Sequence, residues 1–405
     1  MTLFSAPARD RRYVEIRGYR EEDRKALGHL LALAFGGDVA EWERYFDTAR
    51  NRRLDPGLVY IAEEDGAPRA TAAVLPLEVH VDGRAAPAGG VAAVATHPAY
   101  RRKRLAGGVL RAVLYGMRER GLHLSMLEPF AHAFYRVHGW ELAGDTVTYD
   151  LSPTQLPTSP GQSALRAYRE SDLPALRSLL EEEAARHPVC VRRSEGRWRE
   201  ILDGSGSGGY EAAVYEGGGA VEGYLVYRAR RGEAERKTLE VAELVARTPR
   251  AREALVSFMA AYDPLEWRVK HQTSPGERLH PFLESSHVSA ALEPDKMLRL
   301  VDVEGALSHL SRPAPEPLVL EVSDDAIPEN AGLYTVGTGN VVRGAAAPER
   351  VRLDVRQLAQ LYAGYLSAGQ LHRRGLVAPS SPEALELLDA IFPAGDPWVF
   401  PLDHF

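Results

Sequence analysis

The residues best suited to chemistry lie in the segment VAAVATHPAYRRKRLAGGVLRAVL, at positions 91–114. A near-continuous apolar run at 91–96 predicts a buried strand, and apolar residues at helical spacing predict a helix over 106–120. A helix that begins just after a strand points unpaired backbone N–H groups at the connecting turn, where they bind anions. That turn reads RRKR, and residues 98–120 hold seven cations against one acid. Charge alone would also fit a solvated basic loop, but the position between strand and helix favours a site for a diphosphate.

The elements around this segment must hold the turn in place, and their patterns predict the order β-α-β-β-β-α. Residues 15–17 predict a short strand, and residues 21–35 predict a helix with leucines on one face. Two successive hairpins are expected because the Asp-Gly dipeptides at 65–66 and 82–83 adjoin alternating apolar runs. Gly121 is expected to end the helix that follows the basic turn.

The rest of the chain indicates a duplication followed by a third unit. After a proline-rich run with the composition of a linker, LRAYRESDLPALRSLL echoes the earlier IRGYREEDRKALGHLL. The distance between the two copies is far beyond that of a repeat array and indicates a duplicated domain. The expected organisation is a domain at 1–150, a linker at 151–163, a second domain at 164–294 and a third at 295–405. In the third, strands are expected at 318–322 and 332–336, and helices at 355–367 and 382–391.

Composition and charge exclude several classes of protein. The 405 residues carry 49 basic and 56 acidic side chains, a formal charge of −7, so no nucleic-acid partner is expected and a cationic small molecule suits the surface better. A single cysteine, Cys190, excludes an intrachain disulfide and fits a reducing cytoplasm. No apolar run reaches the length of a membrane span, so no membrane partner is expected. The histidines show no metal-binding spacing, and no metal is expected.

At the basic turn the sequence resembles the acyl-CoA pyrophosphate loop of Gcn5-related N-acetyltransferases (GNAT), whose pattern is Arg/Gln-x-x-Gly-x-Gly/Ala. Arg101, Leu105 and Ala106 fit this pattern, whereas Arg104 replaces the usual glycine. Glycine allows unusual φ and close approach to phosphate, so either the loop is displaced or the Arg104 side chain adds a contact. With FYRVHGWE, VAELVART, KMLRLVDVEGAL and LAQLYAGYLSAGQL, the sequence resembles the Eis family of bacterial acetyltransferases over nearly the whole chain.

The resemblance implies a mixed α/β fold of three parts: two GNAT domains, each a mixed central sheet flanked by helices, and a C-terminal domain similar to sterol carrier protein 2 (SCP2). We expect the second GNAT-like domain to be catalytically silent because Pro249 interrupts the turn that would match the basic loop. The resemblance also implies acetyl-CoA as co-substrate and a homo-oligomer, with a hexamer as the implied form. The residues expected to contact acetyl-CoA are Val94, Ala95, Thr96, Arg101, Arg102, Lys103, Arg104, Leu105 and Ala106.

Acetyl transfer needs an acid for the departing thiolate and a base for the amine. The resemblance implies that Tyr135 is the acid; a partly buried core tyrosine is the alternative. It implies that the base is the α-carboxylate of Phe405, where the sequence ends; a frayed end is the alternative. Asp38 and Trp42 align with acceptor-binding residues, since a cation fits a carboxylate and an indole face; a surface acid and a core indole are equally open.

The expected function is acetyl-CoA-dependent N-acetyl transfer, which makes the chain an enzyme. The acceptor would be an amine of a cationic small molecule, such as an aminoglycoside or a polyamine, or a lysine side chain. The alternative is a lipid or sterol carrier on a degenerate acetyltransferase scaffold, because the third domain resembles a lipid-carrying module.

Overall fold

The computed structural model describes residues 14–202, 209–231, 237–283, 285–312, 314–337, 341–344 and 347–405. The chain forms two compact units. The first comprises the chain up to Pro76, Ala88–Leu127 and Phe405, and the second comprises Leu77–Pro87 and Glu128–His404. Within the described ranges, every helix is too short or too polar to cross a membrane.

The first unit is built on a sheet with the strand order β1-β2-β3-β4-β5. Both Asp-Gly dipeptides make the predicted hairpin turns, and all four turn residues have positive φ, as two-residue turns of this kind require. The strands are β1 (Val14–Gly18), β2 (Val59–Glu64), β3 (Ala67–Val81), β4 (Arg84–Thr96) and β5 (Leu124–Leu127). The helices are α1 (Arg24–Phe35), α2 (Val39–Tyr45) and α3 (Leu105–Glu119).

Helix α3 carries the amphipathic pattern that the sequence predicts. Its residues Val109, Leu110 and Val113 are fully buried, and Gly121, with φ of 67°, ends it as a left-handed residue at a helix terminus does. Helix α1 begins later than predicted, because residues 21–23 form a 3₁₀ turn. The basic turn therefore leads into a helix that is fixed by its buried face.

The second unit contains a larger sheet with the strand order β13-β6-β12-β11-β10-β9-β7, and β8 pairs with the last residues of β3. Its strands are β6 (Glu141–Leu151), β7 (Leu165–Ala167), β8 (Val189–Val191), β9 (Glu211–Gly217), β10 (Ala220–Arg231), β11 (Lys237–Ala246), β12 (Trp267–Thr273) and β13 (Ser289–Leu300). Its helices are α4 (His132–Arg136), α5 (Leu173–Ala184), α6 (Glu195–Leu202) and α7 (Pro249–Ala260). Strand β13 runs through the expected boundary between residues 294 and 295.

The predicted duplication recurs in the local structure. In the first copy Arg17 donates to Asp23 at 2.7 Å, and Asp23 accepts the backbone N–H of residue 20. In the second copy Arg166 donates to Asp172 at 2.7 Å, and Asp172 accepts the backbone N–H of residue 169. Each copy thus fastens a first strand to the turn that starts the following helix.

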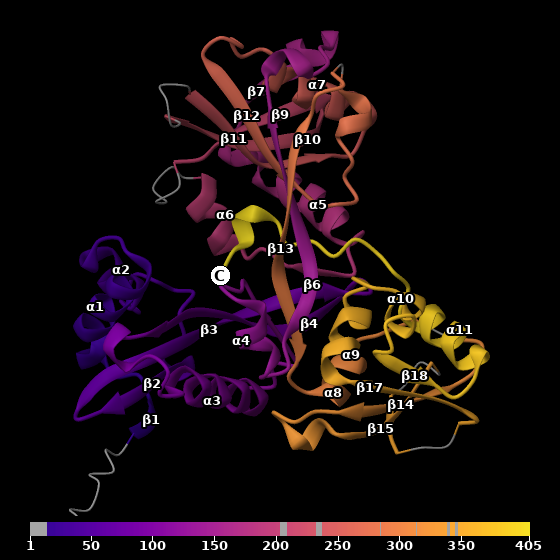
Figure 1. Cartoon of the computed structure of the whole chain (residues 1–405). Coiled ribbons are helices and arrows are strands. Elements are labelled where there is room, and N and C mark those ends of the chain that lie inside the picture. Colours follow the sequence, from indigo (N-terminus) through magenta and orange to yellow (C-terminus); the bar gives the residue numbers. More distant parts are fainter. Residues whose placement is uncertain are drawn as a thin grey trace, which may run out of the picture. The chain divides into compact units, whose positions relative to one another are not determined.

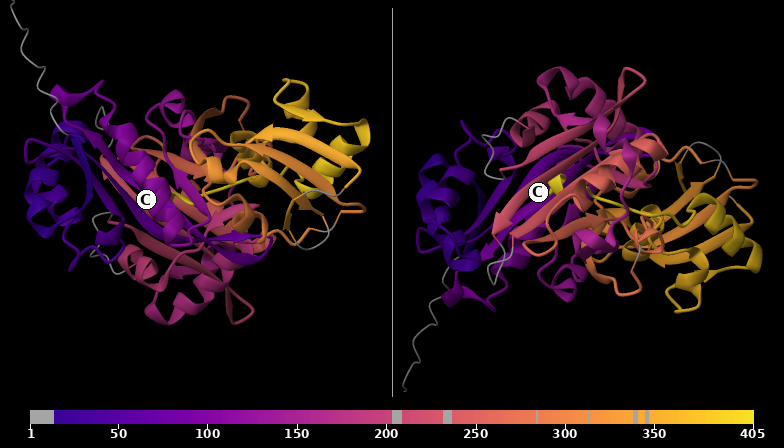
Figure 2. Two further views of the ribbon diagram at one scale, coloured as in Figure 1. Left: turned by 90° about the horizontal axis from the view of Figure 1, so that it is seen from below. Right: turned by 90° about the horizontal axis from the view of Figure 1, so that it is seen from above.

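The third part of the chain has its own sheet, with the order β16-β15-β14-β17-β18. Its strands are β14 (Leu318–Ser323), β15 (Gly332–Val336), β16 (Val342–Arg343), β17 (Glu349–Asp354) and β18 (Val377–Pro379), and its helices are α8 (Val303–Leu307), α9 (Val355–Tyr362), α10 (Ala368–His372) and α11 (Pro382–Ile391). In Figure 2 the yellow helices α10 and α11 lie beside the orange strands of this sheet. After α11 the chain runs without regular structure to a 3₁₀ turn at Pro401–Asp403, close to α6 (Figure 1).

Candidate active site

Strand β4, which precedes the basic turn, separates from β5 before the residues that are expected to contact the acyl donor. The parallel pairing of β4 and β5 joins Ala88–Gly90 to Leu124–Met126, and β4 runs on to Thr96. Ala93 has φ of 52°, a left-handed conformation that is rare for a residue with a side chain. Such a kink re-aims the backbone locally. Directly after it stand Val94, Ala95 and Thr96, the residues expected to polarise a thioester.

The basic turn has the backbone conformation that a glycine would normally supply. Arg102 and Arg104 have φ of 64° and 62°, and Arg104 is the residue that precedes α3. A left-handed conformation costs a residue with a side chain about 1–2 kcal/mol. Arg101 to Arg104 are all exposed, whereas Leu105 is buried and anchors the first turn of α3, and Ala106 is half-buried. Arg104 thus keeps the glycine-like backbone while its guanidinium faces solvent.

Part of the positive charge at the turn is already paired. The Lys103 ammonium lies 3.4 Å from both carboxylate oxygens of the buried Glu64. It also lies 4.3 Å from the ring centroid of Tyr100, and the Arg69 guanidinium lies at the same distance from that ring. Lys103 therefore shapes the turn as well as charging it, which leaves the exposed arginines as the groups best suited to a diphosphate.

The last residue is seated on β4. A Cβ atom added to Gly90 would lie 2.6 Å from Cγ of Phe405 and 2.8 Å from its Cβ, so only glycine leaves room for the ring. Phe405 packs against the same hydrophobic cluster as Trp42, Ala92 and Ala93. The structure therefore brings together three parts that the sequence analysis singled out: the C-terminal residue, one expected acceptor residue and the strand before the basic turn.

Asp38 and Trp42 have local structural roles. The exposed Asp38 precedes α2, and its carboxylate accepts the N–H of Ala40 at 3.0 Å. The Trp42 indole N–H donates to the carbonyl of Gly36 at 2.8 Å, and its ring lies 5.7 Å from that of Phe35. These contacts orient both side chains within the first unit.

Tyr135 lies on α4, in the second unit, whereas the basic turn and Phe405 belong to the first. Its side chain is 2% exposed and stands among aromatic rings, with centroids 5.0 Å from Phe134, 5.4 Å from Phe130 and 6.2 Å from Trp140. This burial raises the pKa of Tyr135 well above its ordinary value. The phenol therefore holds its proton throughout the neutral range.

A further ionic pair was missed by the sequence analysis. The imidazole of His404 bonds to the carboxylate of Glu128, and the Lys296 ammonium lies 3.3 Å from the same carboxylate. Burial alone would raise the pKa of Glu128, but these two partners hold it below its ordinary value. The only sequence signal was an acid directly after the strand at 124–127. Among the described residues, no group of three or more histidine, cysteine and acidic side chains is placed to hold a metal ion.

Comparison with known families places two of the three parts in one superfamily. Models described as "Acetyltransferase (GNAT) domain" match residues 15–143 and residues 189–300. The chain therefore contains two GNAT domains and is an acyltransferase. A model described as "Sterol carrier protein domain" matches residues 303–400, so the mixed α/β fold of two GNAT domains and an SCP2-like domain is confirmed. GNAT domains use acetyl-CoA as the acyl donor, which the exposed arginines and the kinked strand of the first domain fit.

Relatives of similar length match nearly the whole chain. Two uncharacterized N-acetyltransferases of Streptomyces avermitilis are 26% and 28% identical, over 95% and 89% of this chain and 98% and 95% of their own. A GCN5-related N-acetyltransferase of Anabaena variabilis is 22% identical over 97% of this chain and all of its own, with a TM-score of 0.85. Eis1 of Mycobacterium abscessus is 23% identical with the same coverage and a TM-score of 0.78. At this identity the solved structures show a shared fold.

Proposed function

We propose that this enzyme transfers the acetyl group of acetyl-CoA to an amine of a cationic small molecule, aminoglycoside-like or polyamine-like, or to a lysine side chain. Tyr135 is the general acid and the α-carboxylate of Phe405 the general base. The proposal also includes a homo-oligomer, hexameric by resemblance to the Eis family, a cytoplasmic location, and no nucleic-acid or membrane partner.

The proposed residues divide the reaction between them. Arg101, Arg102 and Arg104 hold the diphosphate, and backbone N–H groups around Val94–Thr96 polarise the thioester carbonyl. The amine nitrogen then forms a bond to the carbonyl carbon as the carbon–sulfur bond breaks. The Phe405 carboxylate takes the proton that the amine loses, and the Tyr135 hydroxyl gives a proton to the sulfur. Solvent restores both groups.

The observation that carries this proposal is the packing of Phe405 against β4. A chain end is normally frayed, yet this one packs against β4 at Gly90 and shares a cluster with Trp42. A free α-carboxylate has an ordinary pKa of about 3.3–3.7 and is a weak base.

Within the described part of the SCP2-like domain, one cavity bears on the alternative function, a lipid carrier. A cavity there is lined by Leu307, Leu310, Val336, Val341 and Ile391, together with Arg312 and Gly337. Its volume is about 10 Å³, which is room for about one water molecule. A sterol or fatty acid does not fit in this cavity.

A panel assay tests the function. Free thiol release from acetyl-CoA is followed with aminoglycosides, polyamines and lysine peptides, alongside calorimetric titration with acetyl-CoA, a fatty acid and a sterol. We expect acetyl-CoA to bind and at least one cationic amine to be acetylated. Binding of the lipid without binding of acetyl-CoA would overturn the proposal in favour of a carrier.

A further inference from the structure

The second GNAT domain repeats the strand arrangement that frames the donor site of the first. Strands β11 and β12 are parallel and pair from Lys237 with Trp267 to Val241 with His271, and α7 follows β11. In the first domain β4 and β5 are parallel as well, and α3 follows β4. Beyond the last pair of β11 and β12 lies a cleft that corresponds to the proposed donor site.

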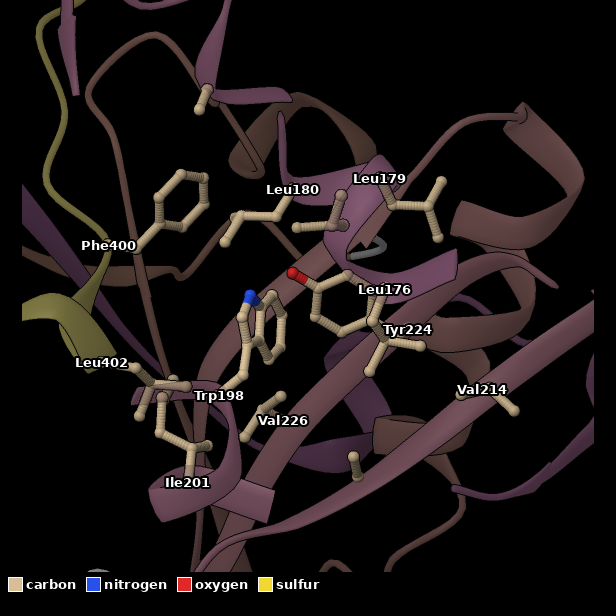
Figure 3. Close-up of a cluster of buried hydrophobic side chains, with 14 of the residues drawn as sticks. Leu176, Leu179, Leu180, Trp198, Ile201, Val214, Tyr224, Val226, Phe400 and Leu402 are labelled. Carbon is tan, nitrogen blue, oxygen red and sulfur yellow. The ribbon is translucent and has the colours of Figure 1, made fainter. Parts of the chain in front are cut away.

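The C-terminal segment of the chain fills this cleft. A cavity of about 50 Å³ remains, and its lining combines residues of β11, β12 and α7 with Trp398 and Phe400. Trp398, Phe400 and Leu402 are 5%, 5% and 2% exposed and belong to the core cluster of the second domain. Figure 3 shows Phe400 and Leu402 beside Leu180 and Trp198 of that cluster. What remains of the cleft suits a few water molecules and has no room for the pantetheine arm of a second acetyl-CoA.

A buried ionic cluster fastens the end of the segment. The Arg193 guanidinium donates to Asp403 at 2.7 and 2.9 Å and to Glu243 on β11 at 3.1 Å. The side chains of Arg193 and Glu243 are fully buried and that of Asp403 is 2% exposed. The hydroxyl of Tyr224 on β10 donates to Glu243, and the Trp198 ring lies 4.3 Å from the guanidinium.

The main chain of the segment is held as well. Arg197 on α6 donates to the carbonyl of Leu402 from two nitrogens, at 2.9 and 2.8 Å. Burying a charged side chain costs the free energy of removing its water, so a buried ion pair is weak evidence of stability. Such a pair is better explained by a need to specify one arrangement of the chain. The planar fork of Arg193 accepts a carboxylate in one geometry. It therefore fixes which residue of the segment sits in the cleft.

Fixing Asp403 also limits Phe405. One residue, His404, lies between them, and an extended chain spans at most about 3.3–3.6 Å per residue, so the Cα atom of Phe405 stays within about 7 Å of that of Asp403. We propose that the second GNAT domain is a docking socket for the chain's own C-terminal segment, with Arg193 as the positioning residue that sets the place of the Phe405 carboxylate. This inference rests on the proposed role of that carboxylate, and it gives the catalytically silent domain a function.

Truncation of Asp403 tests the socket with little disturbance to the fold, because Arg193 keeps Glu243 as a partner. Asp403→Ala should lower kcat at least ten-fold while the KM for acetyl-CoA stays within two-fold, and hydrogen exchange of residues 398–405 should rise at least ten-fold. Asp172→Ala is the matched control, since it breaks an Arg–Asp pair in the same domain away from the segment. It should leave kcat and this exchange unchanged.

Two further measurements separate positioning from simple destabilisation. Arg197→Met removes only the donors to the Leu402 carbonyl and should give a smaller loss of kcat than Asp403→Ala. Added 3-phenylpropanoate, which is Phe405 without its amino group, should partly restore the turnover of Asp403→Ala and leave Asp172→Ala unaffected. A stability defect would not respond to this carboxylate.

Appending residues after Phe405 distinguishes the two proposals. If the extension abolishes turnover while Asp403→Ala turns over normally, the carboxylate is the base and the socket is overturned. If the extended protein turns over normally, the carboxylate is not the base and Arg193 has no catalytic position to set; exchange of residues 398–405 then reports docking alone. Loss of turnover in both variants, with acetyl-CoA binding intact, supports both proposals.

Discussion

Replacing Gly90 with alanine should reduce turnover about 100-fold without unfolding the first domain. The new methyl group would lie 2.6 Å from Cγ, 2.8 Å from Cβ and 2.9 Å from Cδ2 of Phe405. Carbon atoms pack at about 3.5–4.0 Å, so the ring must move by about 1 Å. Gly90 pairs with Met126 in the β4–β5 ladder, so the terminal residue yields and the strand does not. A misplacement of about 1 Å in a catalytic group costs about 10²-fold in rate, or about 2.7 kcal/mol of activation free energy.

The assay measures kcat by thiol release, acetyl-CoA affinity by calorimetry and thermal unfolding for each variant. Gly18→Ala is the control, because a methyl group at that position in β1 meets nothing within 4 Å. In a Phe405→Gly background the substitution at residue 90 meets neither the ring nor the Cβ atom of residue 405, so it should lower turnover by less than about three-fold, and the two changes should be strongly non-additive. If Gly90→Ala folds, binds acetyl-CoA and turns over within two-fold of the parent protein, the seat of Phe405 has no catalytic role.

Three other predictions follow from the site and the second domain. Arg101→Ala or Arg102→Ala should each weaken acetyl-CoA binding about 10- to 100-fold, the equivalent of losing a charge-assisted contact of about 1.5–3 kcal/mol; unchanged affinity in calorimetry for both variants would rule out the loop. Tyr135→Phe should lower kcat about 10²–10⁴-fold with little change in acetyl-CoA affinity. Because burial raises the pKa of Tyr135, the alkaline limb of the profile of kcat against pH in the parent protein should lie above pH 10. A limb near pH 8 that survives the substitution would show that a different group produces it. Burial lowers the pKa of His271 to about 4, whereas in the unfolded chain this histidine takes up its proton at about pH 6.5. The free energy of unfolding should therefore fall by up to about 3 kcal/mol as the pH falls from about 6.5 to 4. In urea unfolding, the free energy of His271→Asn should depend less on pH, and an equal slope in both proteins would refute the assignment.

Local signals in the sequence predict much of the fold. The Asp-Gly turns and the stop at Gly121 depend only on neighbouring residues, and so does α11, which begins at Pro382 after Ser381 and ends at Ile391 as predicted. The predicted helix over 355–367 is wrong in its second half. Helix α9 ends at Tyr362, Gly364 has φ of 66°, and Ser367 caps the separate helix α10. Ser367 and Gln370 form the capping box that starts α10, and this pair is a local signal in the sequence.

The parts that could not be predicted depend on contacts between distant residues. Strand β13 continues through Pro294 because it pairs with β6, although the register shifts there. Arg193 and Asp403 are 210 residues apart, and Glu128 and His404 are 276 apart. In the sequence these are ordinary charged residues. The basic turn was readable because all of its parts lie within one strand, turn and helix.

The most direct test of the account is to compare turnover of the chain with and without a few residues appended to Phe405. If the Phe405 carboxylate is the base, the extension moves that charge away from the amine, and acetyl transfer should fall by at least about 10²-fold, with acetyl-CoA affinity and thermal unfolding unchanged. Deleting Phe405 should act in the same way, because a carboxylate on His404 falls short by up to about 3.3–3.6 Å. An extended protein that acetylates amines at the normal rate would contradict the central claim.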